Sequence, residues 1–220
     1  MTEPSGGSME AHRRPVVVPA VALTALTAVG ITALLGGLGE AQVQPDPLSP
    51  GAVLDQGLYE TKFVESRVTV QKGEGSWDED KRFVDMVFDV TNKGDETLQV
   101  GSPPDKIEQA YLSTSFAGSL VKITPAFGKD SVAAYALSKG GETEQLQPGV
   151  PSRVLVRYEL EKNEQPPKQI TLDVASFAEE QEFNNDLLAW QMVATESGER
   201  GYLPEIKARV TLPVKKGATG

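Results

Sequence analysis

The stretch FVDMVFDVT, Phe83–Thr91, decides the fold class, because apolar and polar side chains alternate along it. Asp85 and Asp89 would point to one side of an extended chain. The opposite side would carry Val84, Met86, Phe88 and Val90. A two-residue period of this kind is typical of a strand buried on one face only. We therefore expect the four apolar residues in a core and the two aspartates in solvent.

Turn chemistry follows this strand. Asn92-Lys93-Gly94-Asp95 contains an asparagine and a glycine, which tolerate the positive φ of a tight hairpin. Residues 97–100 would then return as the partner strand. The same reasoning predicts further strands at Tyr59–Gln71, Leu120–Thr124, Val132–Leu137, Arg153–Leu160, Gln169–Val174 and Ile206–Val214. Seven or more short strands with regular turn signals indicate an all-β sandwich.

Two stretches resist assignment from their pattern. Residues 105–116 fit a helical turn or a strand, and residues 177–190 form a long acidic and aromatic excursion. No long amphipathic helix stands out in the chain, because the two-residue period dominates.

Two motifs support a resemblance to a known family. The stretch VFDVTNKGDETL at residues 87–98 resembles the strand–turn–strand signature of bacterial immunoglobulin-like domains, and LQPG at 146–149 followed by RVLVRY at 153–158 is similar to their later turn and strand. The layout is similar to that of membrane-anchored actinobacterial proteins of unknown function, and to small secreted immunoglobulin-like antigens of that phylum. The resemblance implies an immunoglobulin-like antiparallel β-sandwich and brings no catalytic residue.

An uncharged apolar run precedes the predicted sandwich. Residues 15–38 contain no charged or amide side chain and follow Arg13 and Arg14. As a helix the run would reach roughly 36 Å, enough to cross a hydrocarbon core of about 30 Å. Basic residues on its N-terminal flank predict a single-pass plasma-membrane anchor with the N-terminus in the cytoplasm and the rest of the chain outside.

A cleaved signal peptide is the alternative interpretation of this run. Signal peptides have apolar regions of about 7–15 residues, so the length favours a retained anchor. Gly39 and Ala41 nevertheless occupy the small-residue positions that a signal peptidase reads, and cleavage near Ala41 would release a secreted domain. Both alternatives export the domain.

The remaining boundaries follow from composition. Residues 1–14 are a short polar cytoplasmic tip, within which Met9 is an alternative start to Met1. Residues 39–54 are rich in proline, which favours an extended tether. The predicted sandwich spans 55–214, and residues 215–220 form a frayed tail.

Charge argues against nucleic acid as a partner. The chain has 31 acidic and 21 basic residues, and its first 38 residues contain two of each, so residues 39–220 keep the full net charge of −10. This surface repels phosphate backbones, and no lysine or arginine cluster opposes the repulsion. Ordinary solubility is a sufficient reason for the acidity.

Most catalytic and metal chemistries that use histidine or cysteine are excluded from the exported part. The chain has no cysteine, and its one histidine is His12. Triads with histidine, thiol catalysis, zinc sites with His or Cys ligands, disulfides and lipidated cysteines are therefore unavailable there.

Two weak motifs remain. Ser119-Leu120-Val121-Lys122 matches the S-x-x-K motif of penicillin-binding proteins, but its companion elements are missing and a coincidence is favoured. Asp78-Glu79-Asp80, near Asp85, offers oxygens for calcium, but the spacing is not that of an EF-hand and an acidic surface turn is favoured. A glycosidase-like carboxylate pair is not singled out by anything in the sequence.

Aromatic residues beside carboxylates offer a binding alternative. Phe177, Phe183 and Trp190 lie in the acidic excursion, and Trp77 lies in a glycine-rich turn. Such rings bind sugars or peptides, but we favour the interpretation that they close one end of the sandwich.

The sequence thus predicts a non-enzymatic, membrane-anchored accessory module that engages an envelope protein. The alternative is a protein that binds a cell-wall glycan, a lipid or a small molecule through the sandwich loops or an inter-sheet cavity. No catalytic, cofactor-binding or metal-binding residue is assigned, no cofactor is expected, and the oligomeric state is left open.

Overall fold

Residues 44–73, 75, 77–128, 132–181, 187–197 and 201–217 are described by the computed structural model. The run 15–38, and with it the predicted anchor, the cytoplasmic tip and the cleavage site, lies outside the described residues. Within the described part, no helix has the length and hydrophobicity needed to cross a membrane.

The unit from Pro45 onward is built almost entirely of strands. Their bounds are β1 (Asp46–Leu48), β2 (Val53–Asp55), β3 (Tyr59–Gln71), β4 (Lys81–Asn92), β5 (Leu98–Gln99), β6 (Lys122–Thr124), β7 (Val132–Ser138), β8 (Gly141–Thr143), β9 (Gln145–Leu146), β10 (Pro151–Leu160), β11 (Gln169–Ala175), β12 (Phe177–Gln181), β13 (Leu188–Met192), β14 (Ala194–Glu196), β15 (Tyr202–Pro204) and β16 (Ile206–Lys216). The described helical segments are one turn, α2 (Ile107–Ala110), and the 3-10 turn η1 (Ala117–Ser119).

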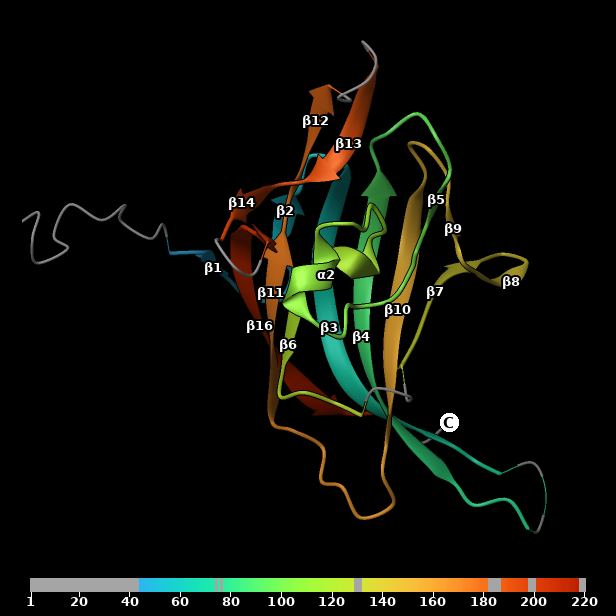
Figure 1. The fold of residues 1–220 in the computed structure, drawn as a ribbon. Helices are drawn as coiled ribbons and strands as arrows, with labels where there is room; N and C mark the ends of the chain where they lie inside the picture. Colours follow the sequence, from blue (N-terminus) through green and yellow to red (C-terminus); the bar gives the residue numbers. More distant parts are fainter. Residues whose placement is uncertain are drawn as a thin grey trace, which may run out of the picture. The chain divides into compact units, whose positions relative to one another are not determined.

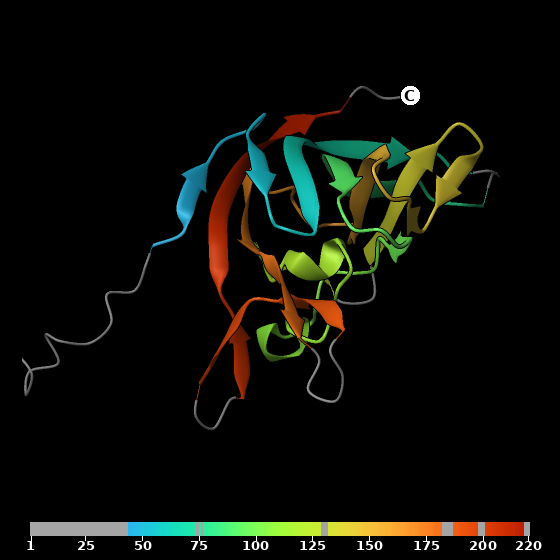
Figure 2. The ribbon, with the colours of Figure 1, turned by 90° about the horizontal axis from the view of Figure 1, so that it is seen from above.

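The described strands form a sandwich from one folded-over sheet. Its path runs β6-β11-β16-β3-β4-β10-β7-β8, with β1 beside β16 and β2 beside β3. Strand β16 belongs to both layers, since it pairs antiparallel with β11 along most of its length and parallel with β3 over Val214–Lys216. Figures 1 and 2 show the sheet curving around an interior, with α2 on its open side.

Side chains from both layers and from the segment around α2 and η1 fill this interior. Val84, Met86, Phe88 and Val90 are all fully buried, which confirms the predicted core face of β4. The ring of Phe88 lies edge-on to Phe63, 5.8 Å between centroids, and to Phe116, 5.3 Å. Phe116 precedes η1, so the β5–β6 connection completes the core.

The prediction that Asp85 lies in solvent is wrong. Its side chain is fully buried. Asp89, four residues further along β4 on the same face, is partly exposed. In the strand register, Asp85 lies opposite Arg67 of β3 on one side and opposite Arg157 of β10 on the other. Because β4 is a central strand, long side chains from both neighbours cover its outer face and exclude water from Asp85.

The predicted hairpin between residues 83–91 and 97–100 is also wrong. Both edges of β4 are already occupied, by β3 and β10, so β5 pairs with β9 instead. No described residue other than glycine has positive φ, and Gly94 is not among the glycines that do. Asn92 acts through its side chain: Oδ1 accepts the Gly94 N–H, and Nδ2 donates to the carbonyls of Glu96 and Leu146.

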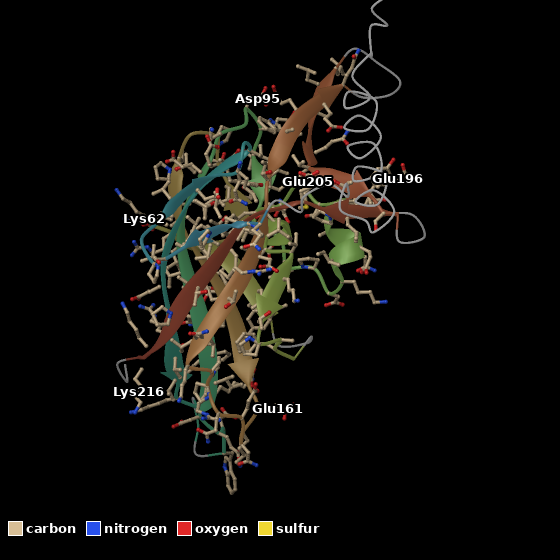
Figure 3. The ribbon with its side chains drawn as sticks, turned by 90° about the vertical axis from the view of Figure 1, so that its left-hand side faces the viewer. Lys62, Asp95, Glu161, Glu196, Glu205 and Lys216 are labelled. Carbon is tan, nitrogen blue, oxygen red and sulfur yellow. The ribbon has the colours of Figure 1, made fainter. Side chains whose placement is uncertain are left out.

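The other predicted strands are present within about two residues of their predicted bounds. The bounds of β3, Tyr59–Gln71, are the predicted bounds. Of the stretches that resisted assignment, residues 105–116 contain the helical turn α2, and the excursion contains the hairpin β12–β13. Figure 3 places Asp95 and Glu196 toward one end of the sandwich and Glu161 and Lys216 toward the opposite end.

The sandwich begins and ends beyond the predicted bounds. Part of the predicted tether forms β1, parallel to β16, and β2, antiparallel to β3. Pro47 is tolerated because β1 is an edge strand, where a missing N–H costs no ladder bond. Part of the predicted tail continues β16 as far as Lys216. Tail residues 218–220 lie outside the described part.

Candidate functional site

The S-x-x-K serine is part of a buried hydrogen-bond network. Ser119 is fully buried, and its hydroxyl donates to the Phe116 carbonyl at 2.7 Å and accepts from Gln56 Nε2 at 2.8 Å. Gln56 also donates to the Ala175 carbonyl and accepts from the Thr61 hydroxyl. Lys122 is exposed on β6. Ser119 therefore has a structural role in this network, in which Gln56 joins Thr61 of β3 to Ala175 of β11. No sequence pattern marks Gln56, because an isolated glutamine matches no motif.

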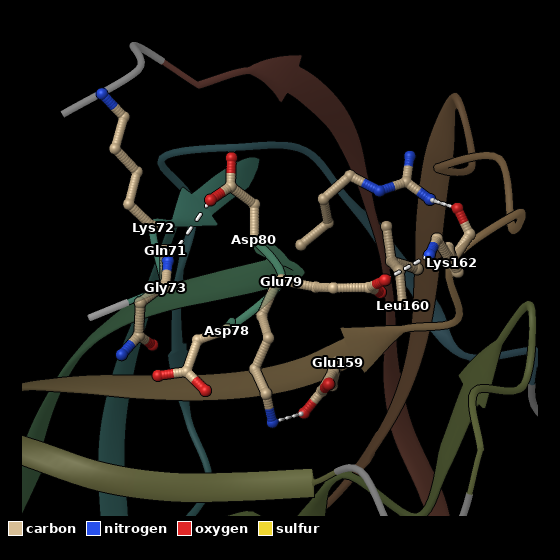
Figure 4. A pocket seen from close by; sticks show the side chains of 11 residues that line it. Gln71, Lys72, Gly73, Asp78, Glu79, Asp80, Glu159, Leu160 and Lys162 are labelled. Carbon is tan, nitrogen blue, oxygen red and sulfur yellow. Dashed lines mark hydrogen bonds and ion pairs between the residues drawn. The ribbon is translucent and has the colours of Figure 1, made fainter. Parts of the chain in front are cut away.

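The acidic triplet lies in an open pocket of about 690 Å³ beside the β3–β4 connection, shown in Figure 4. Asp78, Glu79 and Asp80 point in different directions there. Glu79 is paired with Lys162 at 2.5 Å, and Asp80 Oδ1 accepts the Gly73 N–H at 3.3 Å. Among the described residues, no group of three or more carboxylate, histidine or cysteine side chains is arranged to hold a metal ion.

Two aromatic residues of the excursion close one end of the sandwich, as we favoured. Phe177 is buried and lies edge-on to Tyr59, 5.6 Å between centroids. Trp190 packs so close to Gly57 that a methyl group there would sit 3.3 Å from its ring. Phe183 lies outside the described residues. Trp77, by contrast, is 95% exposed and contributes nothing to the core.

Arginine side chains shield the outer face of the layer that contains β4. Val87 and Leu155 are 3% exposed although they point away from the core. Arg157 contacts both oxygens of Asp85, at 2.7 and 2.9 Å, and lies 4.8 Å from the centre of the Phe83 ring. The hydrogen bond to Asp85 is the main cause that raises the pKa of Arg157. The ion pair of Arg157 with Asp85 therefore covers part of this face.

One edge of the same layer is open. Strand β7 pairs with β10 along Val132–Leu137, but on its other side β8 covers only Ala136–Ser138. Among the described residues, no strand pairs with that side of Val132–Tyr135. The chain after β8 turns away, and β9 pairs with β5. In Figure 1, β8 projects sideways from β7 at this edge.

A groove of about 1040 Å³ lies along this open edge, and we call it the β7 groove. Its lining residues are Gln99, Gly101, Ser102, Val132, Ala133, Ala134, Tyr135, Glu142, Thr143, Glu144 and Gln145. Burial is the main cause that raises the pKa of Tyr135; the positive charge of Arg157 opposes this rise, and the nearby carboxylates of Glu142 and Asp85 add to it. Among the described lining residues, the charged ones are Glu142 and Glu144, and both are acidic.

A smaller, more apolar pocket lies between the layers. It has a volume of about 450 Å³, and its lining residues include Leu120, Ile123, Phe127 and Tyr158 of β10. The rings of Phe127 and Tyr158 are stacked, 4.7 Å between centroids. Burial raises the pKa of Tyr158 to about 12.

Comparison with known proteins identifies no family for this chain. The sequence matches no protein-family model and no curated protein. Among solved structures, the chain is similar to an uncharacterized β-sandwich protein from Clostridium difficile, with 12% sequence identity and a TM-score of 0.37. The similarity covers 60% of this chain and 90% of that one. A similarity at this level establishes no shared site.

Proposed function

We propose that this chain is a non-enzymatic interaction module of the cell envelope, which engages another protein outside the cytoplasm. The observation that carries the proposal is the open edge of β7, because exposed edges are normally shortened, charged, bulged or covered. The exposed part, Val132–Tyr135, has no charged residue and no proline. Such an edge offers backbone donors and acceptors to a partner chain.

We further propose that the module is held at the plasma membrane by residues 15–38, with residues 39–45 as a spacer. The length of the run and its N-terminal arginines support this arrangement. An immunoglobulin-like topology, as in the actinobacterial proteins that the chain resembles, is part of the proposal. The parallel pairing of β16 with β3, in which one strand serves both layers, supports it.

Site-specific crosslinking in cells would test the proposed function. A photoreactive residue would replace Ala133, which is exposed beside the β7 groove, and in a control chain it would replace Lys207, which is exposed on β16. We expect a protein attached at Ala133 that is absent or much less abundant at Lys207. Equal yields of the same proteins at both positions would show that the β7 edge is no partner site.

The apolar pocket between the layers favours a second candidate function, the binding of a small apolar envelope ligand. Its volume falls within the range of small-molecule sites, and stacked rings form one wall. Native mass spectrometry of the chain purified from its own host would reveal a retained ligand. Phe127→Ala should then release the ligand, and a spectrum with no bound mass in either protein would remove this candidate.

A further inference from the structure

We propose that the β7 groove takes an extended, lysine- or arginine-bearing segment of the partner, which adds to the sheet as a strand beside β7. This inference rests on the proposed function and specifies the chemistry of the partner. It depends on the open backbone edge and on the sign of the charges along the groove.

Backbone geometry determines the shape of the occupant. Along Val132–Tyr135, alternate residues direct their N–H and C=O groups away from β10, toward the groove. No described residue forms a ladder on that side, and β8 ends the covered part at Ala136. Four residues of strand extend over roughly 13 Å, so a short extended segment is enough to pair with the open stretch. An added strand would lie on the same side of β7 as β8, next to the part that β8 leaves open.

The charges along the groove determine the composition of the occupant. Glu142 and Glu144 line it and are both exposed, and no lysine or arginine is among the described residues that line it. Glu142 lies opposite Leu137 in the β7–β8 ladder, and Leu137 lies opposite Arg153 in the β7–β10 ladder. Because opposite residues share a face and Arg153 contacts Asp89 on the outer face, the Glu142 side chain lies on the outer face of the sheet. A basic side chain at every second position of the added strand would share that face and meet these carboxylates.

The same charges disfavour a second copy of this chain as the occupant. If two copies paired through β7, Glu142 and Glu144 of both copies would meet at one edge, and the described lining of the groove has no basic residue to separate them. Each chain also carries a net charge of −10, so the approach of two copies is repulsive at long range. A cationic segment is attracted by both features.

Synthetic peptides would test the inference on the purified full chain. The probe is a fluorescein-labelled heptapeptide of alternating lysine and valine, and the comparison is its glutamate–valine counterpart, with binding measured by fluorescence anisotropy. Two further lysine–valine peptides carry N-methyl groups, one on odd and one on even residues. In strand addition only one of these series loses the N–H groups that face β7, so one peptide should bind at least about tenfold more weakly and the other should not.

Charge reversal in the groove provides the matched variants. Glu142→Lys/Glu144→Lys changes the lining, and Glu179→Lys/Glu180→Lys makes the same change of net charge on β12, where both residues are also exposed. We expect the groove variant to bind the lysine peptide about tenfold more weakly and the β12 variant to stay within about twofold of the parent. Unchanged far-UV circular dichroism in both variants would show that the sheet is intact.

The outcomes separate this inference from the proposed function. Three results would overturn the inference that a cationic strand adds to β7. They are equal binding of the lysine and glutamate peptides, equal weakening by both charge variants, and equal binding of both N-methylated peptides. A distinct partner still attached at position 133 would then leave the proposed function standing. A second copy attached at position 133, with a dimer in sedimentation, would overturn both the cationic segment and the argument from charge repulsion.

Discussion

Replacement of Asp85 by alanine should destabilise the protein far more than replacement of Asp89. The two residues provide a matched comparison, since both are aspartates of β4 on the outer face and each contacts an arginine of β10 through both oxygens. They differ in burial: the side chain of Asp85 is 0% exposed and that of Asp89 is 35% exposed. The Thr69 hydroxyl also donates to Asp85, at 3.0 Å.

The expected magnitudes follow from what each change leaves behind. Asp85→Ala leaves Arg157 without its partner. The Arg157 side chain is 24% exposed, so water can replace the lost carboxylate only poorly. Removal of one member of a fully buried pair costs about 3–5 kcal/mol, and the partial exposure of Arg157 lowers this to about 2–4 kcal/mol. Asp89→Ala leaves Arg153, 53% exposed, free to hydrate, so the loss should be about 0–1 kcal/mol.

Urea unfolding followed by tryptophan fluorescence and far-UV circular dichroism would measure both changes. Trp190 reports unfolding because it is packed against Gly57, whereas the exposed Trp77 adds an almost constant background. A double variant, Asp85→Ala/Arg157→Leu, should recover much of the loss, because no unpaired charge is left. If Asp85→Ala and Asp89→Ala lose equal stability within about 0.5 kcal/mol, burial does not control the strength of this pair and the reasoning is refuted.

Phe88, Gln56 and Tyr158 of the sandwich, and the apolar run at residues 15–38, each allow a further test. Phe88→Ala should lose roughly 3–5 kcal/mol in the same unfolding assay, since the ring is fully buried between two others, and a loss below 1 kcal/mol would contradict its place in the core. Gln56→Leu should lose about 3 kcal/mol because it leaves the buried Ser119 and Thr61 hydroxyls and the Ala175 carbonyl without this partner; a neutral effect would show that water replaces it. The pKa of Tyr158 is raised to about 12 in the folded chain, so its contribution to folding stability is complete below pH 10, the unfolded value, and is lost as the pH rises toward about 12. Tyr158→Phe should therefore flatten the alkaline decline of stability, and an unchanged slope would show that Tyr158 does not cause it. Carbonate extraction of membranes should leave the full-length chain in the pellet, whereas a soluble chain beginning near Gln42 would establish cleavage after Ala41.

Local periodicity was enough to place most strands, but it could not show what covers their outer faces. The alternation along Phe83–Thr91 identified the buried side of β4, because that side depends on only one strand. The burial of Asp85 depends on Arg157, 72 residues away in the sequence, and on β4 having a neighbour on each side. A two-residue period contains no information about strand order, so the polar side was interpreted as solvent-exposed.

Strand order also explains the failed hairpin. Asn92-Lys93-Gly94-Asp95 has turn composition, but composition does not distinguish a tight hairpin from a turn that sends the chain elsewhere. The neighbour of β4 on that side is β10, which begins 59 residues after Asn92 at Pro151. A long-range pairing of this kind is decided by the packing of both layers and has no local signature.

The β7 groove is the result of strand order in the same way, which is why no motif marks it. The sequence of β7 predicts a strand and nothing else, since its alanines and valine would suit a covered strand equally well. The edge becomes a site because β8 is short and β9 departs to pair with β5, and because this departure leaves two glutamates beside unpaired backbone. A change that lengthens β8 along β7 should therefore abolish binding of the lysine peptide without any change of charge. Replacement of Glu144-Gln145 by Thr-Glu-Val-Thr would provide such an extension, and undiminished peptide binding by this variant would show that the open edge is not the binding element.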